Sequence, residues 1–268
     1  MTAALLLMAG ALRAAPTDLS LPDGNTLVRE LAQKQRRWEE ILNTYTYDVE
    51  VVREDLDKDD RVTKRESRRF EVFYVKGRPI RRQVAEGGRP LDPERQAKVD
   101  REVKEKVDDV NQQRVAVETP AVRLSQILER YDFRAVGRED ASGRPAIVLE
   151  FTARPGSRPI AHDDVLRNLA GRVWMDEAER EVVRAEVRST TGMKLFLGLG
   201  ASISAMSGVF EFRKVGDTLW LPLRDETRAA GRMFLFKSFR TRVVHSYGNF
   251  RRFDIQSEEK LHPPAKLQ

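Results

Sequence analysis

The second half of the sequence is a nearly continuous series of short segments in which apolar and polar residues alternate. The clearest is VVRAEVRS, which begins at Val182. A period of two places apolar side chains on one face of a strand and charged ones on the other. Turns that contain Gly or Asp separate the segments, and neither a strand–helix–strand alternation nor an internal repeat is detectable. The pattern therefore predicts one antiparallel sheet, strongly curved or partly closed. The strands expected here are 147–151, 172–176, 182–189, 209–214, 219–223, 233–244 and 250–255.

The first half of the chain mixes two periods. Residues 23–43 have apolar positions at helical spacing among charged and amide side chains, which predicts an amphipathic helix. The period changes to two at Tyr45, which predicts a half-buried strand. The expected order is helix 23–43, strand 45–51, turn 56–61, strand 69–75 and a short strand pair within 77–88. The fold class is therefore mainly β (α+β).

Residues 90–114 differ from the rest because charged side chains dominate them. Their valines form a narrow stripe, and pairs such as Glu102 and Lys106 stand four residues apart, as in a helix. This predicts a solvated helix that contacts the body along one seam, and a mobile lid is the alternative. A second short helix is expected over 120–131, so about 90–131 is interpreted as a helical insertion.

The first fifteen residues have the order of a secretory signal. An apolar run from Leu5 to Leu12 precedes the small residues Ala14 and Ala15. Basic residues do not precede the run, so the signal is expected to be truncated or weak. The run has roughly half the length that spans a bilayer, which favours export over membrane insertion. An alanine-rich tail is the alternative. We expect a signal peptide over 1–15, a single domain over 16–260 and a flexible tail over 261–268.

The residues that usually carry chemistry form no catalytic pattern. Cysteine is absent, which excludes thiol nucleophiles, zinc–thiolate sites and disulfides. His162-Asp163-Asp164 is typical of a solvated loop with a helix cap rather than a metal site. Gly198-Leu199-Gly200 lacks the remaining residues of a phosphate loop or a dinucleotide fingerprint. We therefore expect that the protein is not an enzyme and has no metal site and no cofactor.

The net charge is +6 and the sequence pI is about 9.6. In an exported protein, anionic lipid head groups or cell-wall polymers are the acidic partners that such a charge favours, rather than nucleic acid. A charge that only aids solubility is the alternative.

Two apolar segments stand out in this highly charged chain. Residues 193–206 contain large apolar residues separated by small ones. They predict either a buried strand with a glycine bend or an apolar lip that lines a ligand cavity or dips into lipid. Residues 233–236 (MFLF) would make a strand apolar on both faces, which must be covered by a helix or by a ligand.

Several strand patterns occur in a characteristic order. They are Tyr45-Thr46-Tyr47, the strand GRVWMD at 171–176 followed by VVRAE at 182–186, WLP at 220–222 and YGNFRRF at 247–253. Over about residues 25–258, this order resembles the periplasmic outer-membrane lipoprotein-sorting protein superfamily (LolA/LolB-like), in a poorly characterised exported branch. The resemblance implies an unclosed β-barrel, a curved sheet whose concave apolar face is plugged by helices and accepts acyl chains.

The resemblance and the alternation together predict a soluble periplasmic carrier or sensor that binds an acyl lipid or a lipoprotein. An integral membrane protein is not expected. Burying each methylene of such a ligand contributes on the order of 0.8 kcal/mol. The side chains expected to line the concave face are Tyr47, Val49, Phe70, Val72, Phe210, Phe212, Leu219, Leu221, Phe234 and Phe236.

Two other functions fit the same sequence. Relatives of the fold regulate envelope stress by binding an anti-sigma factor, so a membrane protein of the envelope is the alternative partner. In that case the arginines of the outer faces would mark a protein surface, namely Arg184, Arg188, Arg251 and Arg252. A structural envelope protein with a filled core and no ligand is the third hypothesis.

Overall fold

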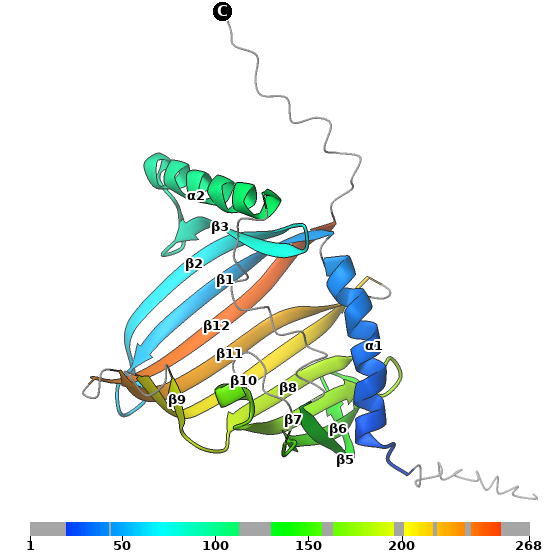
Figure 1. Cartoon of the computed structure of the whole chain (residues 1–268). Coiled ribbons are helices and arrows are strands. Elements are labelled where there is room, and N and C mark those ends of the chain that lie inside the picture. The colour runs from blue at the N-terminus through cyan, green and yellow to red at the C-terminus, as the bar shows by residue number, and fades with distance from the viewer. Residues whose placement is uncertain are drawn as a thin grey trace, which may run out of the picture.

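A computed structural model describes residues 20–42, 44–112, 130–156, 163–195, 201–216, 219–233 and 237–252. The strands within these ranges form one antiparallel sheet in the order β4-β3-β2-β1-β12-β11-β10-β8-β7-β6-β5, with β9 paired to β10. The outermost strands of this order, β4 and β5, are not paired with each other, so the sheet curves without closing (Figure 1). The predicted fold class, a curved unclosed antiparallel sheet accompanied by helices, is confirmed.

The helices are α1 (Gly24–Leu42), α2 (Pro93–Asn111) and the single turn α4 (Asp163–Leu166). The strands are β1 (Tyr45–Leu56), β2 (Val62–Val75), β3 (Arg78–Glu86), β4 (Arg89–Pro90), β5 (Tyr131–Ala141), β6 (Arg144–Ala153), β7 (Leu169–Asp176), β8 (Val182–Ser189), β9 (Met193–Leu195), β10 (Ala201–Val215), β11 (Leu219–Met233) and β12 (Lys237–Arg252).

The last three strands are longer than the sequence predicts. β11 continues to Met233 and β12 begins at Lys237, so the strand predicted over 233–244 is wrong at its start. Gly231, which resembles a turn residue, lies inside β11 opposite Phe239. A Cβ atom at Gly231 would lie 2.0 Å from the Ser202 carbonyl oxygen, so this position needs glycine for close packing. The helix predicted over 120–131 lies mostly outside the described residues, and Tyr131 begins β5.

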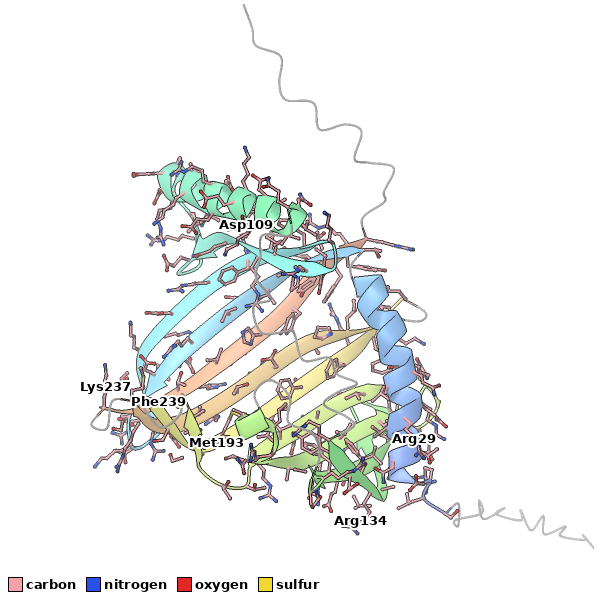
Figure 2. The ribbon with its side chains drawn as sticks, in the orientation of Figure 1. Arg29, Asp109, Arg134, Met193, Lys237 and Phe239 are labelled. Carbon is pink, nitrogen blue, oxygen red and sulfur yellow. The ribbon has the colours of Figure 1, made fainter. Side chains whose placement is uncertain are left out.

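Helix α1 covers one end of the sheet. Its residues Leu27, Val28 and Leu31 are at most 6% exposed and pack against a cluster that includes Ile147 and Leu149 of β6. We call the face under α1 the inner face and the opposite face the outer face. In Figure 2, Arg29 on α1 and Arg134 on β5 mark this covered end.

The edge strand β5 is protected by the start of α1. The Asn25 Oδ1 atom accepts a hydrogen bond from the backbone N–H of Phe133 at 3.0 Å. A Cβ atom at Gly24 would lie 2.5 Å from the Phe133 carbonyl oxygen, so glycine allows the helix to approach this closely. An edge N–H group that would otherwise be free to pair with another chain is thereby satisfied.

Helix α2 is the helix predicted over 90–114, and it lies beside β3 (Figure 1). The Asp92 carboxylate caps its first turn by accepting the N–H of Arg95 at 2.9 Å. Arg82 of β3 joins the helix to the sheet by donating to Asp100 at 2.8 Å and to Glu71 of β2 at 3.1 Å. The helix thus contacts the sheet along one side, as the solvated-helix interpretation predicts.

The turn between β7 and β8 is built around Asp176, which is 2% exposed. Its Oδ1 atom accepts the backbone N–H groups of Ala178 at 3.0 Å and Glu179 at 2.7 Å, and its Oδ2 atom accepts Arg144 Nε at 2.5 Å. Burial pushes the pKa of Asp176 upward, but the hydrogen bonds from Arg144 and the turn backbone outweigh it and hold this pKa below its usual value.

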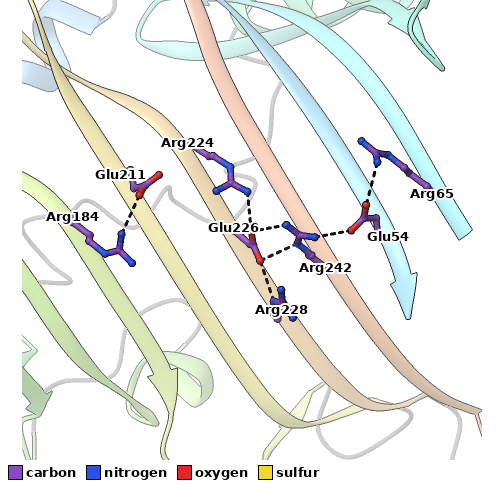
Figure 3. A network of polar contacts seen from close by, with 8 residues as sticks. All are labelled: Glu54, Arg65, Arg184, Glu211, Arg224, Glu226, Arg228 and Arg242. Atoms are coloured by element: carbon purple, nitrogen blue, oxygen red, sulfur yellow. Dashed lines mark hydrogen bonds and ion pairs between the residues drawn. The ribbon is translucent and has the colours of Figure 1, made fainter. Parts of the chain in front are cut away.

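The outer face carries a network of ion pairs that crosses several strands (Figure 3). At its centre, Glu226 of β11 is 17% exposed and accepts hydrogen bonds from Arg224 at 2.9 Å, Arg228 at 3.0 Å and Arg242 at 2.9 and 3.0 Å. Arg242 continues the network to Glu54 of β1 at 3.2 Å. Burial raises the pKa of Glu226, and the hydrogen bonds from Arg242 and Arg228 more than reverse this, so the net direction is downward.

Replacing Glu226 with Gln is expected to lower the free energy of unfolding by about 2 kcal/mol at neutral pH, because three arginines lose their shared counter-charge. A carboxylate with a depressed pKa stabilises the folded state above its unfolded pKa and loses that contribution as the pH falls through the folded value. The difference between the two proteins should therefore shrink below about pH 4.5. Urea unfolding at several pH values measures both effects. Glu186→Gln is the control, because the Glu186 side chain is 42% exposed and pairs with Arg184. An equal loss of unfolding free energy in Glu186→Gln would contradict the central role of Glu226.

Candidate ligand-binding site

The inner face extends well beyond the part that α1 covers. The hydrophobic cluster under α1 includes Val187 on β8 and Met206 on β10 at its margin. Further across the sheet, the inner face is formed by β10, β11, β12, β1 and β2 in turn. The candidate site lies on this second part of the face.

Five of the side chains that the sequence predicts to line a cavity share this face. Val49 lies between Tyr247 of β12 and Phe70 of β2, and Tyr47 lies opposite Val72. Val49 and Val72 are each 2% exposed, whereas Tyr47, Phe70 and the more distant Phe210 are half-buried. This face therefore has partly exposed aromatic side chains on β10, β1 and β2 with buried valines beside them, an arrangement that we call the apolar surface.

Two further predicted lining residues, Leu219 and Leu221, are buried and lie on the inner face beyond the β10–β11 register shift. They alternate along β11 with Trp220, which packs with Trp174 on the outer face, so their side chains point to the inner face. Phe212 packs against a second cluster, which contains Trp174, Val183 and Trp220. Phe234 and Phe236 lie outside the described residues.

The structure also places a polar cluster on this apolar face, which the sequence did not predict. The cluster consists of Asp225 on β11 with His245 and Tyr247 on β12. His245 Nδ1 lies 2.8 Å from Asp225 Oδ1, and the Tyr247 hydroxyl donates to Asp225 Oδ2 at 2.7 Å. The Asp225 side chain is 13% exposed and that of His245 is 25% exposed. Spacing alone gives one hint, since His245 and Tyr247 stand two apart in one strand and must share a face.

Each member of this polar cluster is flanked by an apolar residue on the neighbouring strand. Phe210 is paired with Asp225, Val51 with His245 and Val49 with Tyr247. The cluster is therefore set into the apolar surface rather than placed at its rim.

The tyrosines of the site are neutral over the physiological pH range. Burial raises the pKa of Tyr247, and the hydrogen bond and negative charge of Asp225 raise it further. Burial also raises the pKa of Tyr47, with a smaller effect from Tyr74. Arg81 lies on β3 opposite Val72, on the inner face. Its positive charge lowers the pKa of both tyrosines but does not reverse the net increase. Neutral phenols suit hydrogen bonding and ring packing, and Tyr47 stacks on Phe250 with a centroid distance of 5.2 Å.

No group of three or more His, Asp or Glu side chains in the described ranges could hold a metal ion. In the same part of the chain, no helix is both long enough and apolar enough to cross a membrane.

No protein-family model matches the sequence, and no curated protein matches it. Three solved structures are similar to the chain. A domain named as an outer-membrane lipoprotein-sorting protein from Vibrio parahaemolyticus aligns with 88% of this chain and 94% of its own, at 13% identity and a TM-score of 0.40. A LolA superfamily protein from Nitrosomonas europaea aligns with 84% and 94%, at 14% identity and a TM-score of 0.36. The MucA/MucB complex from Pseudomonas aeruginosa aligns with 83% and 99%, at 13% identity and a TM-score of 0.24. The first two of these structures carry the name of the superfamily that the sequence resembles.

Proposed function

We propose that the protein is an exported carrier or sensor that binds the acyl chain of a lipid or lipoprotein on the inner face of β10, β11, β12, β1 and β2. The observation that carries this proposal is the apolar surface there, in which Tyr47, Phe70 and Phe210 are partly exposed and Val49 and Val72 are buried beside them. The proposed export rests on the signal-like order of residues 1–15.

The energetics of such a site are sufficient for reversible binding. Each methylene removed from water contributes about 0.8 kcal/mol, so an acyl chain of about twelve carbons gains on the order of 9 kcal/mol before ordering costs. Those costs consume several kcal/mol, which leaves about 5–6 kcal/mol and an affinity of about 0.1 mM. A sheet that does not close gives such a ligand a route in and out, which a carrier or a sensor requires.

Two phenylalanines of β2 provide a matched test of the face. Phe70 pairs with Val49 and points to the inner face, whereas Phe73 pairs with Ile80 and points to the outer face. Both are half-buried. We expect Phe70→Gln to weaken binding of a fluorescent twelve-carbon acyl probe about tenfold, the effect of losing about 1.4 kcal/mol of apolar contact. Phe73→Gln should leave probe affinity unchanged. Equal weakening by both variants, at matched thermal stability, would contradict an acyl site on the inner face.

In the alternative function, a regulator that binds an envelope protein, the arginines predicted on the outer faces would form the protein-binding surface. Arg184 is bonded to Glu186 and Glu211 and stacks over Trp174, so it belongs to the outer-face network. Arg251 is 3.9 Å from Asp48. Arg188 and Arg252 are paired in the sheet through their backbones, and their side chains have no hydrogen bond or ion pair to other described residues. Native mass spectrometry of detergent-free protein separates the two functions. A bound acyl species is expected from the carrier, and a mass without ligand in a protein that also fails to bind added acyl probe would favour the regulator.

A further inference from the structure

The polar cluster of Asp225, His245 and Tyr247 leaves specific hydrogen-bonding positions open. A carboxylate oxygen only accepts, so His245 carries its hydrogen on Nδ1 and donates it to Asp225. Within the described residues, His245 Nε2 has no hydrogen-bond partner, and in the neutral imidazole this atom is an acceptor. The Tyr247 hydroxyl has given its hydrogen to Asp225, so its oxygen also remains an acceptor.

The surroundings make these acceptors significant. Their cross-strand neighbours Phe210, Val51 and Val49 are apolar, and the Asp225 carboxylate beneath them adds negative potential. An acyl chain laid across the cluster would strip water from the open acceptors without replacing its hydrogen bonds, which is unfavourable. A ligand with an N–H or O–H group at this point would satisfy them.

We propose that Asp225, His245 and Tyr247 form the head-group end of the acyl site and select ligands that carry a hydroxyl or amide N–H group beside the acyl chain. This proposal rests on the proposed acyl-binding function and adds the chemical class of the ligand. His245 Nε2 and the Tyr247 oxygen contact the ligand, whereas Asp225 orients both side chains.

An anionic head group is the competing occupant. Arg81 is exposed, lies on the same side of the sheet and has no hydrogen bond or ion pair in the described part of the chain. A guanidinium favours a carboxylate, so a fatty acid would bind towards Arg81 instead of towards the acceptors of the polar cluster.

Four probes with the same twelve-carbon chain test the proposal in the full-length protein: 1-lauroylglycerol, N-lauroylglycinamide, methyl laurate and lauric acid. Affinities are measured by displacement of a fluorescent acyl probe. We expect 1-lauroylglycerol, N-lauroylglycinamide or both to bind about tenfold more tightly than methyl laurate, the effect of one well-placed hydrogen bond. The two donor probes separate a hydroxyl from an amide head group.

Variants of His245 assign this preference to the cluster. His245→Phe removes the Nε2 acceptor, so the ratio of donor-probe affinity to methyl laurate affinity, measured on the same variant, should fall severalfold from about tenfold. His245→Gln retains a donor for Asp225 and an acceptor for the ligand, so it should restore part of the preference. Ser246→Ala, on the outer face of the same strand, is the control. Thermal melting of each variant separates a loss of selectivity from a loss of folding.

The outcomes separate this proposal from the acyl-binding function itself. Wild-type protein that binds 1-lauroylglycerol, N-lauroylglycinamide and methyl laurate equally would overturn the head-group proposal and leave acyl binding in place. Tightest binding of lauric acid, insensitive to His245, would overturn it in favour of Arg81. Protein that binds none of the four probes would overturn both proposals.

Discussion

Replacing Asp176 with Ala is expected to lower the free energy of unfolding by about 4 kcal/mol, a large share of the roughly 5–15 kcal/mol that stabilises a folded protein. Asp176 is 2% exposed, and its carboxylate closes the β7–β8 turn through two backbone N–H groups and Arg144. Without the carboxylate, these donors lose their acceptor inside the protein, and Arg144 loses its closest counter-charge. This is the cost of removing one partner from a buried ionic network rather than the value of a surface ion pair.

A second aspartate provides the control for this experiment. Asp140 closes the β5–β6 turn by accepting the N–H of Gly143 at 2.9 Å, but the contact is exposed. Asp140→Ala should cost about 1 kcal/mol or less. The pKa of Asp176 is lowered in the folded protein, so its stabilisation is present above its unfolded pKa and is lost as the pH falls through the folded value. The difference between wild type and Asp176→Ala should therefore diminish below about pH 4. Equal effects of the two substitutions in urea unfolding would contradict the role assigned to Asp176.

The second large effect is expected at Gly171, in the middle of β7. A Cβ atom there would lie 1.9 Å from the backbone oxygen of Glu186 on β8 and 2.9 Å from Cε1 of Phe151 on β6. The first contact is with backbone that is held in the β7–β8 ladder, so the strand itself must move. We expect Gly171→Ala to destabilise the protein by about 3 kcal/mol or more, as overpacking does in well-packed cores.

Gly137→Ala on β5 is the matched substitution, because a Cβ atom at Gly137 meets nothing within 4 Å. It should be neutral or slightly stabilising, because alanine loses less backbone entropy than glycine on folding. Thermal or urea unfolding of both variants measures the contrast. A Gly171→Ala protein as stable as Gly137→Ala would show that β7 and β8 are not packed as closely as described.

The parts of the fold that the sequence predicts are those with a local signal. The alternation at the start of β1 and from Ala185 to Val187 in β8 assigns the faces correctly, because a period of two leaves a single choice once one face is apolar. It fails at Val183, because the β7–β8 register shifts there and Val183 packs with Trp174 on the outer face. The lengths of β10, β11 and β12 were not predicted, because Asp225 and Gly231 resemble turn residues. Both residues lie inside β11, and contacts with neighbouring strands explain why they occur there. Asp225 is hydrogen-bonded to His245 of β12, and Gly231 leaves room for the Ser202 carbonyl oxygen of β10.

The candidate site was predicted only in part for a related reason. Tyr47, Val49 and Phe70 share the inner face because their strands are adjacent and regular. Phe212 does not share this face, because the β10–β11 register shifts between Glu211 and Phe212 and Phe212 packs with Trp174 and Trp220 on the outer face. No local pattern reveals such a bulge. The polar cluster joins Asp225 to His245 and Tyr247 across two strands, so it depends on a pairing register that single residues do not indicate.

Photo-crosslinking with a twelve-carbon acyl probe that carries a diazirine at the chain end identifies the face of the sheet that the acyl chain contacts. The strand β1 offers an internal comparison, because successive residues point to opposite faces. We expect crosslinks at the inner-face residues of β1, Tyr47, Val49 and Val51, and at Phe70 of β2, with labelling suppressed by excess unlabelled acyl ligand. Crosslinks at Asp48, Glu50 and Val52 on the outer face, or labelling that excess ligand does not suppress, would contradict an acyl site on the inner face.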